Sequence, residues 1–320
     1  MHELDRIRLA LVEAAERGEG AVLATVMGVD GSTYRGAGAR MVVRADGSTV
    51  GAVSGGCLEA DIVARAAEVL AAGRVELAHY DTRTADDAVL GLGMGCQGVI
   101  DVQLEPLTGE TLRDAIRQLA ELRARSAVRL LVCGAGTDAI PVVRLAATVG
   151  WLVTVVDHRP SFATAERFPE AERVLRLDVS QMERALASGL RLEEFAAAVV
   201  MAHAAAHDRA RLHELLGVES LRYLGVLGPR RRTLELLEGS AADGTLELPP
   251  NVYAPVGLDL GAETPEEIAL SIVSEIAAVL AGRTPRSLRE RSGPIHEQRA
   301  QSPPVIPSER SESRDPHPTR

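Results

Sequence analysis

The sequence contains no lysine: its 35 basic residues, set against 45 acidic ones, are all arginine, and the formal net charge is −10. A chain without lysine cannot form a pyridoxal Schiff base, and it cannot supply the phosphate-binding lysine of a Walker A loop. Aromatic residues are also scarce, with three Phe, four Tyr and one Trp, so stacking surfaces for single-stranded nucleic acid are poorly supplied. Composition and charge therefore argue against a nucleic-acid partner.

Cysteine is the next scarce residue. The three cysteines, none spaced as C-x-x-C, fit neither a disulfide framework nor a tetrahedral zinc site. The first twenty residues carry charges where a signal peptide needs an apolar run, and no stretch reaches the ~18 apolar residues of a membrane span. We therefore expect a cytoplasmic protein with reduced thiols and no membrane association. At 320 residues and 46% hydrophobic content, the chain is long enough for two domains.

The pattern over residues 1–107 predicts a small α+β domain. Apolar residues recur at helical spacing over residues 2–18, and a second helical pattern follows Cys57. Apolar-rich segments predict strands at 21–27, 39–45, 48–53, 74–80 and 98–104. Asp46-Gly47 is typical of a two-residue hairpin in which both central residues have positive φ. We therefore expect a helix-flanked antiparallel sheet.

The pattern then changes. Residues 108–128 predict a connecting helix, and residues 129–283 predict a Rossmann-like α/β domain in which strands and helices alternate around a parallel sheet. The strands are expected at 129–133, 152–156, 196–201 and 222–227, and the helices at 138–149, 208–216 and 230–238. Thr264-Pro265-Glu266-Glu267 predicts the start of a last helix that runs to about Leu280. Residues 284–320, rich in Pro, Ser, Arg and Glu, are expected to be disordered.

A dinucleotide-binding fingerprint lies at the start of the second domain. Gly134 and Gly136 begin a G-x-G-x-x-A motif directly after a strand and before a helix, where glycines let helix N–H groups approach a pyrophosphate. Asp157, at the end of the next strand, is expected to meet a ribose hydroxyl, and Arg159 either faces a 2′-phosphate or is a surface arginine. The alternative is a Rossmann-type fold whose groove is empty or repurposed.

Arginines begin a later helix at Gly228-Pro229-Arg230-Arg231-Arg232. Cations at a helix N-terminus oppose the helix dipole unless an anion binds between them. Arg230 and Arg231 are therefore candidates for a phosphate site. The alternative is that these arginines point to solvent and pair with Glu235 and Glu238.

The segment Ser54-Gly55-Gly56-Cys57 precedes a helix, where unpaired backbone N–H groups favour a thiolate. Cys57 is thus a candidate reactive thiol. Cys96 lies in a second glycine-rich loop that could approach the first, and Cys133, inside a predicted strand, is expected in the core.

Two further groups of polar residues are weaker candidates. Arg35 and Arg40 flank a glycine-rich segment that suits an anionic ligand, or is simply a turn. His203 and His207 are four apart, but we do not expect them to share a face, and no metal site is predicted.

Seven ordered motifs carry a resemblance that extends from about residue 10 to residue 282. They are GSTYRGAGARMVV, SGGCLEADIV, YDTRTADDAVLGLGMGCQG, LLVCGAGTDAIPVVRLA, VTVVDHRP, YLGVLGPRRR and VGLDLGAETPEEIALSI. By these motifs the sequence resembles the XdhC/CoxI family, the xanthine dehydrogenase accessory proteins.

The resemblance implies a molybdenum cofactor chaperone. Such a protein holds molybdopterin transiently while a cysteine desulfurase helps to install the sulfido ligand, and delivers it to a molybdenum hydroxylase of the xanthine or CO dehydrogenase type. It implies Cys57 as the thiol near the cofactor. Candidate cofactor-binding residues are Arg35, Arg40, Ser54, Gly55, Gly56, Cys96, Gly134, Gly136, Asp138, Asp157, Arg159, His203, Arg230 and Arg231.

Nothing in this interpretation requires catalysis, and a homodimer stays open. We expect one cleft between the Cys57 segment and the Rossmann-like sheet edge. The alternatives are an NAD(P)-dependent oxidoreductase, supported by the glycine fingerprint, and a scaffold that binds the desulfurase and the hydroxylase without the cofactor.

Overall fold

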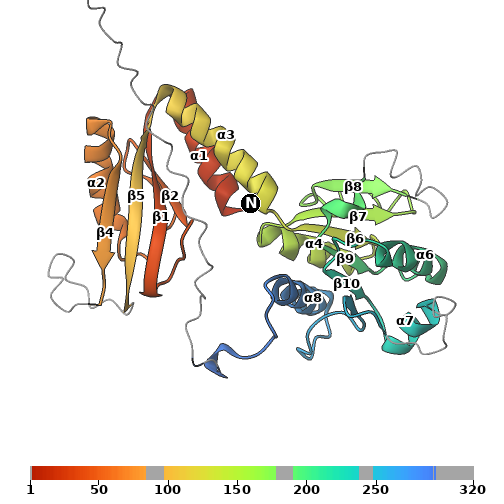
Figure 1. The fold of residues 1–320 in the computed structure, drawn as a ribbon. Helices are drawn as coiled ribbons and strands as arrows, with labels where there is room; N and C mark the ends of the chain where they lie inside the picture. Colours follow the sequence, from red (N-terminus) through yellow and green to blue (C-terminus); the bar gives the residue numbers. More distant parts are fainter. Residues whose placement is uncertain (1, 84–96, 178–189, 238–247, 291, 293–320) are drawn as a thin grey trace, which may run out of the picture.

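The computed structural model describes residues 2–83, 97–177, 190–237, 248–290 and 292 (Figure 1). Two α/β domains follow one another along the chain. The first consists of α1 (Glu3–Glu16), β1 (Ala21–Ser32), β2 (Arg40–Arg44), β3 (Thr49–Gly51), α2 (Glu59–Ala72), β4 (Glu76–Asp81), β5 (Gln97–Leu107) and α3 (Gly109–Ser126). The second consists of β6 (Arg129–Cys133), α4 (Ala139–Thr148), β7 (Leu152–Asp157), β8 (Arg173–Arg176), β9 (Ala197–Val200), α6 (Ala205–Leu216), β10 (Tyr223–Val226), α7 (Arg230–Leu237), β11 (Val252–Tyr253) and α8 (Pro265–Leu280).

The first domain contains an antiparallel sheet, as the sequence predicts, and its strand order is β3-β2-β1-β5-β4. Helix α2 packs on one face, and α1 and α3 pack together on the other (Figure 1). Side chains of β1 alternate between the two cores, with Val22 and Ala24 on the α2 side and Leu23 on the α1 side. Helix α3 buries Leu112 and Leu119 in the core beside α1, so it is part of this domain's packing and not a free connector.

The turn between β2 and β3 differs from the prediction. Gly47 has a φ of 81°, but Asp46 is not among the described residues with positive φ. The backbone N–H of Gly47 donates to the Arg44 carbonyl (2.9 Å), and the Asp46 carboxylate accepts from the Ser48 N–H (2.9 Å). Because the Asp46 side chain accepts from the Ser48 N–H, the turn takes the longer form in which one glycine supplies the left-handed residue.

The second domain contains a parallel sheet of order β11-β10-β9-β6-β7-β8. Helices α4 and α8 cover one face, and α6 and α7 cover the other. Strand β6 explains why these strands are apolar throughout: Leu130 contacts the α4 core and Leu131 the α6 core. The fold class is therefore as predicted, an α+β domain followed by a Rossmann-like domain.

The predicted strands and helices of the second domain are present, with two additions; α6 begins at Ala205, three residues before the predicted start, and residue 238 lies outside the described residues. The edge strands β8 and β11 were not predicted, since β8 is half-exposed with an arginine at each end and β11 has two residues. At α8 the predicted capping box is present: Glu267 N–H donates to Thr264 Oγ1 (3.3 Å), and Thr264 N–H donates to the Glu267 carboxylate (2.9 Å). Most of the tail predicted to be disordered lies outside the described residues.

Candidate functional site

The segment before α2 folds around the buried hydroxyl of Ser54. Ser54 Oγ accepts the backbone N–H groups of Gly56 (3.1 Å) and Leu58 (3.2 Å) and is bonded to the Glu59 carboxylate, which also accepts the Ser54 N–H (2.9 Å). Burial alone would raise the pKa of Glu59, but its hydrogen bonds with Ser54 and Leu58 lower it. The carboxylate of Glu59 is therefore ionised, and its hydrogen bonds fix the conformation of this segment.

The Cys57 thiol lies half-buried within this arrangement. Its Sγ is 3.5 Å from Ser54 Oγ. The Leu58 N–H at the start of α2, expected to favour a thiolate, donates instead to Ser54 and to Glu59 (both 3.2 Å). The structure thus places Cys57 at the helix start, as predicted, but gives this amide another acceptor.

Tyr34 is a residue that the sequence analysis missed. Its ring lies against Gly55, where an added Cβ would be 3.5 Å from the ring, and 64% of the residue is exposed. The neighbouring Arg35 is held by Glu3 of α1 (2.5 Å), so Arg35 anchors this loop instead of standing free for an anion. Its place in the GSTYR motif beside Gly31 and Arg35 was the available signal for Tyr34.

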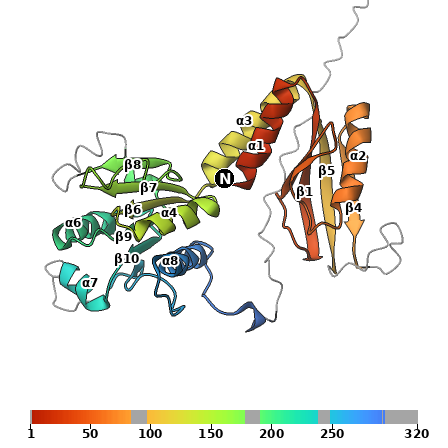
Figure 2. The ribbon, with the colours of Figure 1, turned by 180° about the vertical axis from the view of Figure 1, so that it is seen from behind.

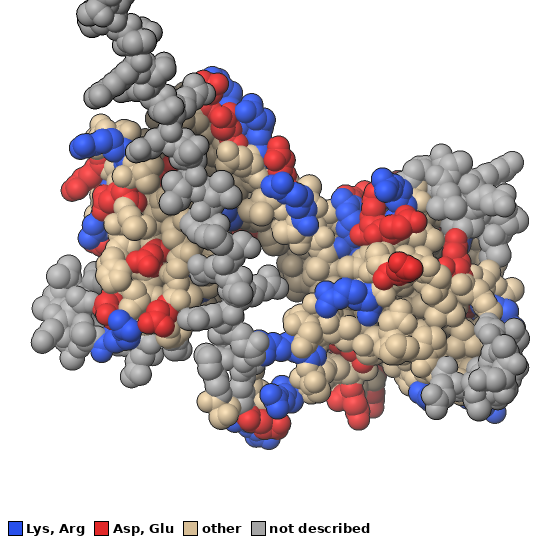
Figure 3. Space-filling view, viewed as in Figure 1, with Lys and Arg blue, Asp and Glu red and all other residues tan. Residues whose placement is uncertain are grey.

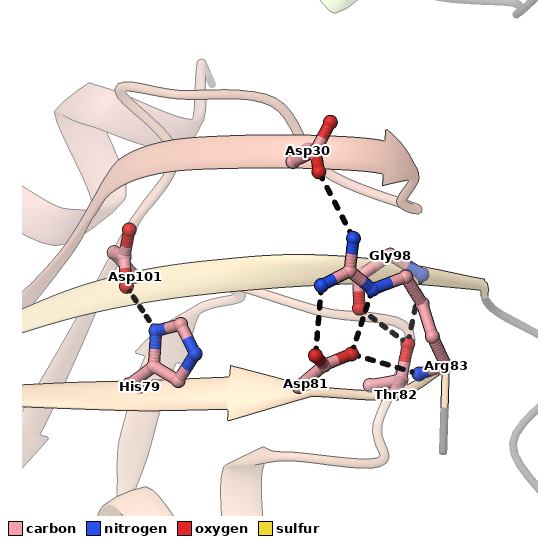
Figure 4. Close-up of polar contacts among 7 residues, drawn as sticks. All are labelled: Asp30, His79, Asp81, Thr82, Arg83, Gly98 and Asp101. Carbon is pink, nitrogen blue, oxygen red and sulfur yellow. Dashed lines mark hydrogen bonds and ion pairs between the residues drawn. The ribbon is translucent and has the colours of Figure 1, made fainter.

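Figure 4 shows the polar contacts that join the ends of β1, β4 and β5 in the first sheet. Arg83 binds the carboxylates of Asp81 (2.8 Å) and Asp30 (3.1 Å), and Thr82 Oγ1 donates to the Gly98 carbonyl (2.7 Å). These contacts join Thr82 and Arg83, at the end of β4, to the start of β5 and to the end of β1. Cys96 lies outside the described residues.

Arg40 lines a cavity of about 570 Å³ between α3 and the face of the first sheet on which α1 and α3 pack. The register places Arg40, Thr25 and Gln103 in one row across β2, β1 and β5. Arg40 donates to the Gly38 carbonyl (3.2 Å), and burial lowers the pKa of its guanidinium. No described carboxylate is paired with Arg40, although Glu105 and Asp114 line the same cavity, and the anion-binding role of Arg40 stays a prediction.

The carboxyl ends of β6, β7 and β9, with the loops that follow them, form what we call the Rossmann edge. Gly134 has a φ of 126°, and a Cβ there would lie 2.5 Å from the Met201 carbonyl oxygen, so glycine allows two strands to meet closely. Asp157 stands at the end of β7 as predicted. Its carboxylate accepts from the Ala135 N–H (2.7 Å) and from Arg159 (2.8 Å), so neither group stands free for a ribose.

Histidines surround the same edge. His203 has a φ of 58°, and its Nε2 is 2.7 Å from the Asp138 carboxylate of the fingerprint loop. His207, in the first turn of α6, stacks on His158 with ring centroids 3.8 Å apart. His203 and Asp138 are thus brought together as candidate site residues. Within the described ranges, no cluster of three or more His, Cys, Asp or Glu could hold a metal ion.

The arginines at the start of α7 are partly paired. Arg231 lies 3.2 Å from Glu235, and Arg232 binds the buried carboxylate of Asp208 (2.5 Å). A concavity of about 410 Å³ beside them is lined by Arg231, Arg232 and Arg209, whereas Arg230 is not among its lining residues. The pairing of Arg231 with Glu235 follows the alternative interpretation. On the face shown in Figure 3, arginines lie beside acidic residues instead of forming one extended basic patch.

Among the described residues, the Cys57 segment and the Rossmann edge do not face one another. Cys57 packs against the core on the α2 face of the first sheet, and α1 and α3 cover the opposite face. Figures 1 and 2, which view the protein from opposite sides, both show the α1–α3 pair between the first sheet and the second domain. The described residues therefore do not form the expected shared cleft, because the α2 face is turned away from the second domain.

Two family models match the chain in the order of its domains. Residues 14–81 match the XdhC and CoxI family, and residues 130–276 match the XdhC Rossmann domain. These matches define the class: a two-domain α/β protein whose second domain is of the Rossmann type. The chain belongs to the XdhC and CoxI family, as its sequence motifs indicated.

Individual relatives cover both domains. A Bacillus subtilis protein named as a probable xanthine dehydrogenase subunit is 33% identical, over 83% of this chain and 94% of the relative. The Escherichia coli protein PaoD, named a molybdenum cofactor insertion chaperone, is 26% identical over 84% of this chain and 86% of its own. The crystal structure of a Bacillus halodurans protein described as a xanthine dehydrogenase superposes with a TM-score of 0.75 and 29% identity, covering 89% of this chain and 97% of that one. No described helix is long and apolar enough to cross a bilayer.

Proposed function

We propose that this protein holds the molybdenum cofactor and delivers it to a molybdenum hydroxylase of the xanthine or CO dehydrogenase type. The observation that carries the proposal is the similarity to PaoD, a named insertion chaperone, which extends over 84% of the chain and so includes both domains. The similarity to a protein named for xanthine dehydrogenase supports the same class of client. Delivery requires binding and release, and the chain needs no catalytic group of its own for either.

The residues present fit a group that carries phosphate and sulfur ligands. Arg40 offers a half-buried guanidinium without a described carboxylate partner beside a cavity of about 570 Å³, a volume in the range of small-molecule sites. Cys57 offers a half-buried thiol on the α2 side of the same sheet, in a segment that Ser54 and Glu59 hold in place; it does not line the Arg40 cavity and is a second, separate candidate contact. When bound, the cofactor supplies the molybdenum centre and its dithiolene. The chain's part is to bind the phosphate, orient the group and shield it from water.

In this proposal the Cys57 thiol contacts the cofactor at the end of the first sheet, while a cysteine desulfurase supplies the sulfur. Replacing Cys57 by Ala removes one small, half-buried side chain, so the fold is expected to persist while activation of the client is impaired. The measurement is client activity after co-expression with wild-type or variant protein, normalised to molybdenum content. The matched control is Leu77→Ala, which alters an exposed side chain of the same domain.

Equal client activation by Cys57→Ala and wild type would remove the thiol from the proposal. Equal activation with and without the whole protein would remove the chaperone function itself. Purification of the protein with the client but with no pterin absorbance would instead favour a scaffold.

A further inference from the structure

The carboxylate of Asp157 has no free acceptor position. Its Oδ2 accepts from the Ala135 N–H (2.7 Å) and Arg159 Nη2 (2.8 Å), and its Oδ1 accepts from Arg159 N (2.8 Å) and Nε (2.9 Å). The side chain is 0% exposed. A carboxylate offers about four lone-pair sites, so these four hydrogen bonds occupy them. A ribose diol could reach Asp157 only by displacing Arg159.

Arg159 is itself fixed on a second side. Its guanidinium lies over the ring of Phe162, 3.9 Å from the centroid, while two of its nitrogens bind Asp157. Burial alone would raise the pKa of Asp157, but the hydrogen bonds from Arg159 and Ala135 lower it to about 2, so the carboxylate stays ionised and paired. Displacing Arg159 would therefore break a bidentate ion pair and a cation–π contact together.

A second arginine at this edge is not neutralised. Arg167 also lies over Phe162 (4.9 Å), and its Nη2 donates weakly to the carbonyl of Ala135 in the fingerprint loop (3.4 Å). Its Nε is buried without a hydrogen-bond partner, and no carboxylate in the described part of the chain forms an ion pair with it. A buried N–H without an acceptor is costly. The Arg167 guanidinium already contacts the fingerprint loop through Nη2, so Arg167 is a candidate to bind an anion held at that loop.

The remaining charges around the loop are paired. Asp138 is hydrogen-bonded to His203, and Asp157 binds Arg159 and lies 3.4 Å from His158 Nδ1, so Arg167 is the arginine without a carboxylate partner among the described residues that contact the loop. The loop is where Rossmann proteins hold a phosphate, whereas the end of β7 is where they hold a ribose. At the fingerprint loop, Arg167 has an unused N–H donor. At the end of β7, the Asp157 carboxylate has no unused acceptor.

We propose that the Rossmann edge binds a phosphate-bearing ligand through Arg167 and rejects nicotinamide dinucleotides, because Arg159 keeps Asp157 from the ribose. Arg159 is thus the specificity-determining residue and Arg167 the anion-binding residue. This inference goes beyond cofactor delivery and does not depend on it, since it concerns a different domain from Cys57.

The first test titrates the full-length protein with NADH and follows nicotinamide fluorescence. Wild type is expected to show no saturation up to about 1 mM, and Arg159→Met, which keeps the contact with Phe162 but frees Asp157, is expected to bind at least about tenfold more tightly. The double variant Asp157→Asn/Arg159→Met avoids an unpaired buried charge and still offers an amide to the diol, so it covers the case in which the single variant does not fold. Saturation of wild type by NADH, or no gain in either variant, would overturn the specificity claim.

The second test measures pyrophosphate binding by calorimetry in wild type, Arg167→Met and Arg144→Met. Arg144 is an exposed arginine of the same domain that pairs with Glu170 (3.4 Å), so it is the matched control. We expect Arg167→Met to weaken binding by about tenfold or more and Arg144→Met to leave it unchanged. Absence of pyrophosphate binding by wild type, or an equal effect of the two substitutions, would refute the role of Arg167. Client activation is not read in either test, so these outcomes leave the proposed delivery function standing or falling separately.

Discussion

Gly134 is a single residue on which the approach of two strands depends. Its φ of 126° is unfavourable for any residue with a Cβ, and the added atom would lie 2.5 Å from the Met201 carbonyl oxygen, which belongs to backbone and cannot swing away. We therefore expect Gly134→Ala to lower the free energy of unfolding by on the order of 2–4 kcal/mol, more than backbone strain alone. Urea unfolding followed by circular dichroism measures this loss.

The control for this prediction is Gly18→Ala. Gly18 also has positive φ (68°), but an added Cβ there would meet no atom within 4 Å. It therefore reports the cost of the backbone conformation alone, about 1 kcal/mol. Equal losses for the two variants would show that the close approach at Gly134 relaxes.

The described cysteines should differ in reactivity. Burial raises the pKa of the Cys133 thiol to about 12, so it is protonated at neutral pH, whereas Cys57 is half-buried at a loop. We expect iodoacetamide at pH 8 to alkylate Cys57 in the folded protein and Cys133 only in denaturant. Peptide mass spectrometry reads both sites, and rapid labelling of Cys133 under native conditions would contradict its place in the β6 core.

At the scale of elements, the loop after β7 couples stability to pH. The pKa of Asp157 is about 2 in the folded protein against a usual value of 3.8, so its ionised form contributes stability above about pH 4, and this contribution is lost as the pH falls toward 2. The full contribution is about 2 kcal/mol. We expect the stability difference between wild type and Asp157→Asn to narrow by about 1 kcal/mol between pH 6 and pH 3. Urea unfolding at both pH values measures this, and a constant difference would mean that Asp157 titrates normally.

Elements with strong local signals were predictable from sequence. The capping box at Thr264 and the apolar run of β6 are each made by neighbouring residues in the sequence, so α8 and β6 lie where predicted. The form of the turn at Asp46 was not predictable. A glycine at position 47 is compatible with a two-residue or a longer hairpin loop, and the hydrogen bond from Ser48 N–H to Asp46 decides between them. The partner of Asp157 was also missed: Arg159 is visible two residues later, but only the loop conformation turns it back onto the carboxylate.

At the scale of the whole molecule, the domain order was predictable and the shared cleft was not. Which face of the first sheet points toward the second domain depends on where α3 packs. That packing is set by Leu112 and Leu119 meeting Ile7 and Leu11 of α1, residues roughly a hundred positions apart in sequence. The helical pattern of α3 indicates an apolar face but not its partner, so a connector and a packed helix look alike in sequence.

The two domains have separate cores, which predicts separate unfolding. Leu11 is fully buried between α1 and the first sheet, and Ile272 is fully buried between α8 and the second sheet. Replacing either by Ala should cost about 2–5 kcal/mol within its own domain. Trp151, the single tryptophan, packs on the second core, so its fluorescence reports that domain while circular dichroism reports both.

We expect Ile272→Ala to shift the fluorescence midpoint in urea and Leu11→Ala to leave it unchanged while shifting part of the dichroism transition. The two domains also touch where His2 lies against Gly150. If Leu11→Ala moved the fluorescence and the dichroism transitions together, that contact would be strong enough to make the two domains one cooperative unit.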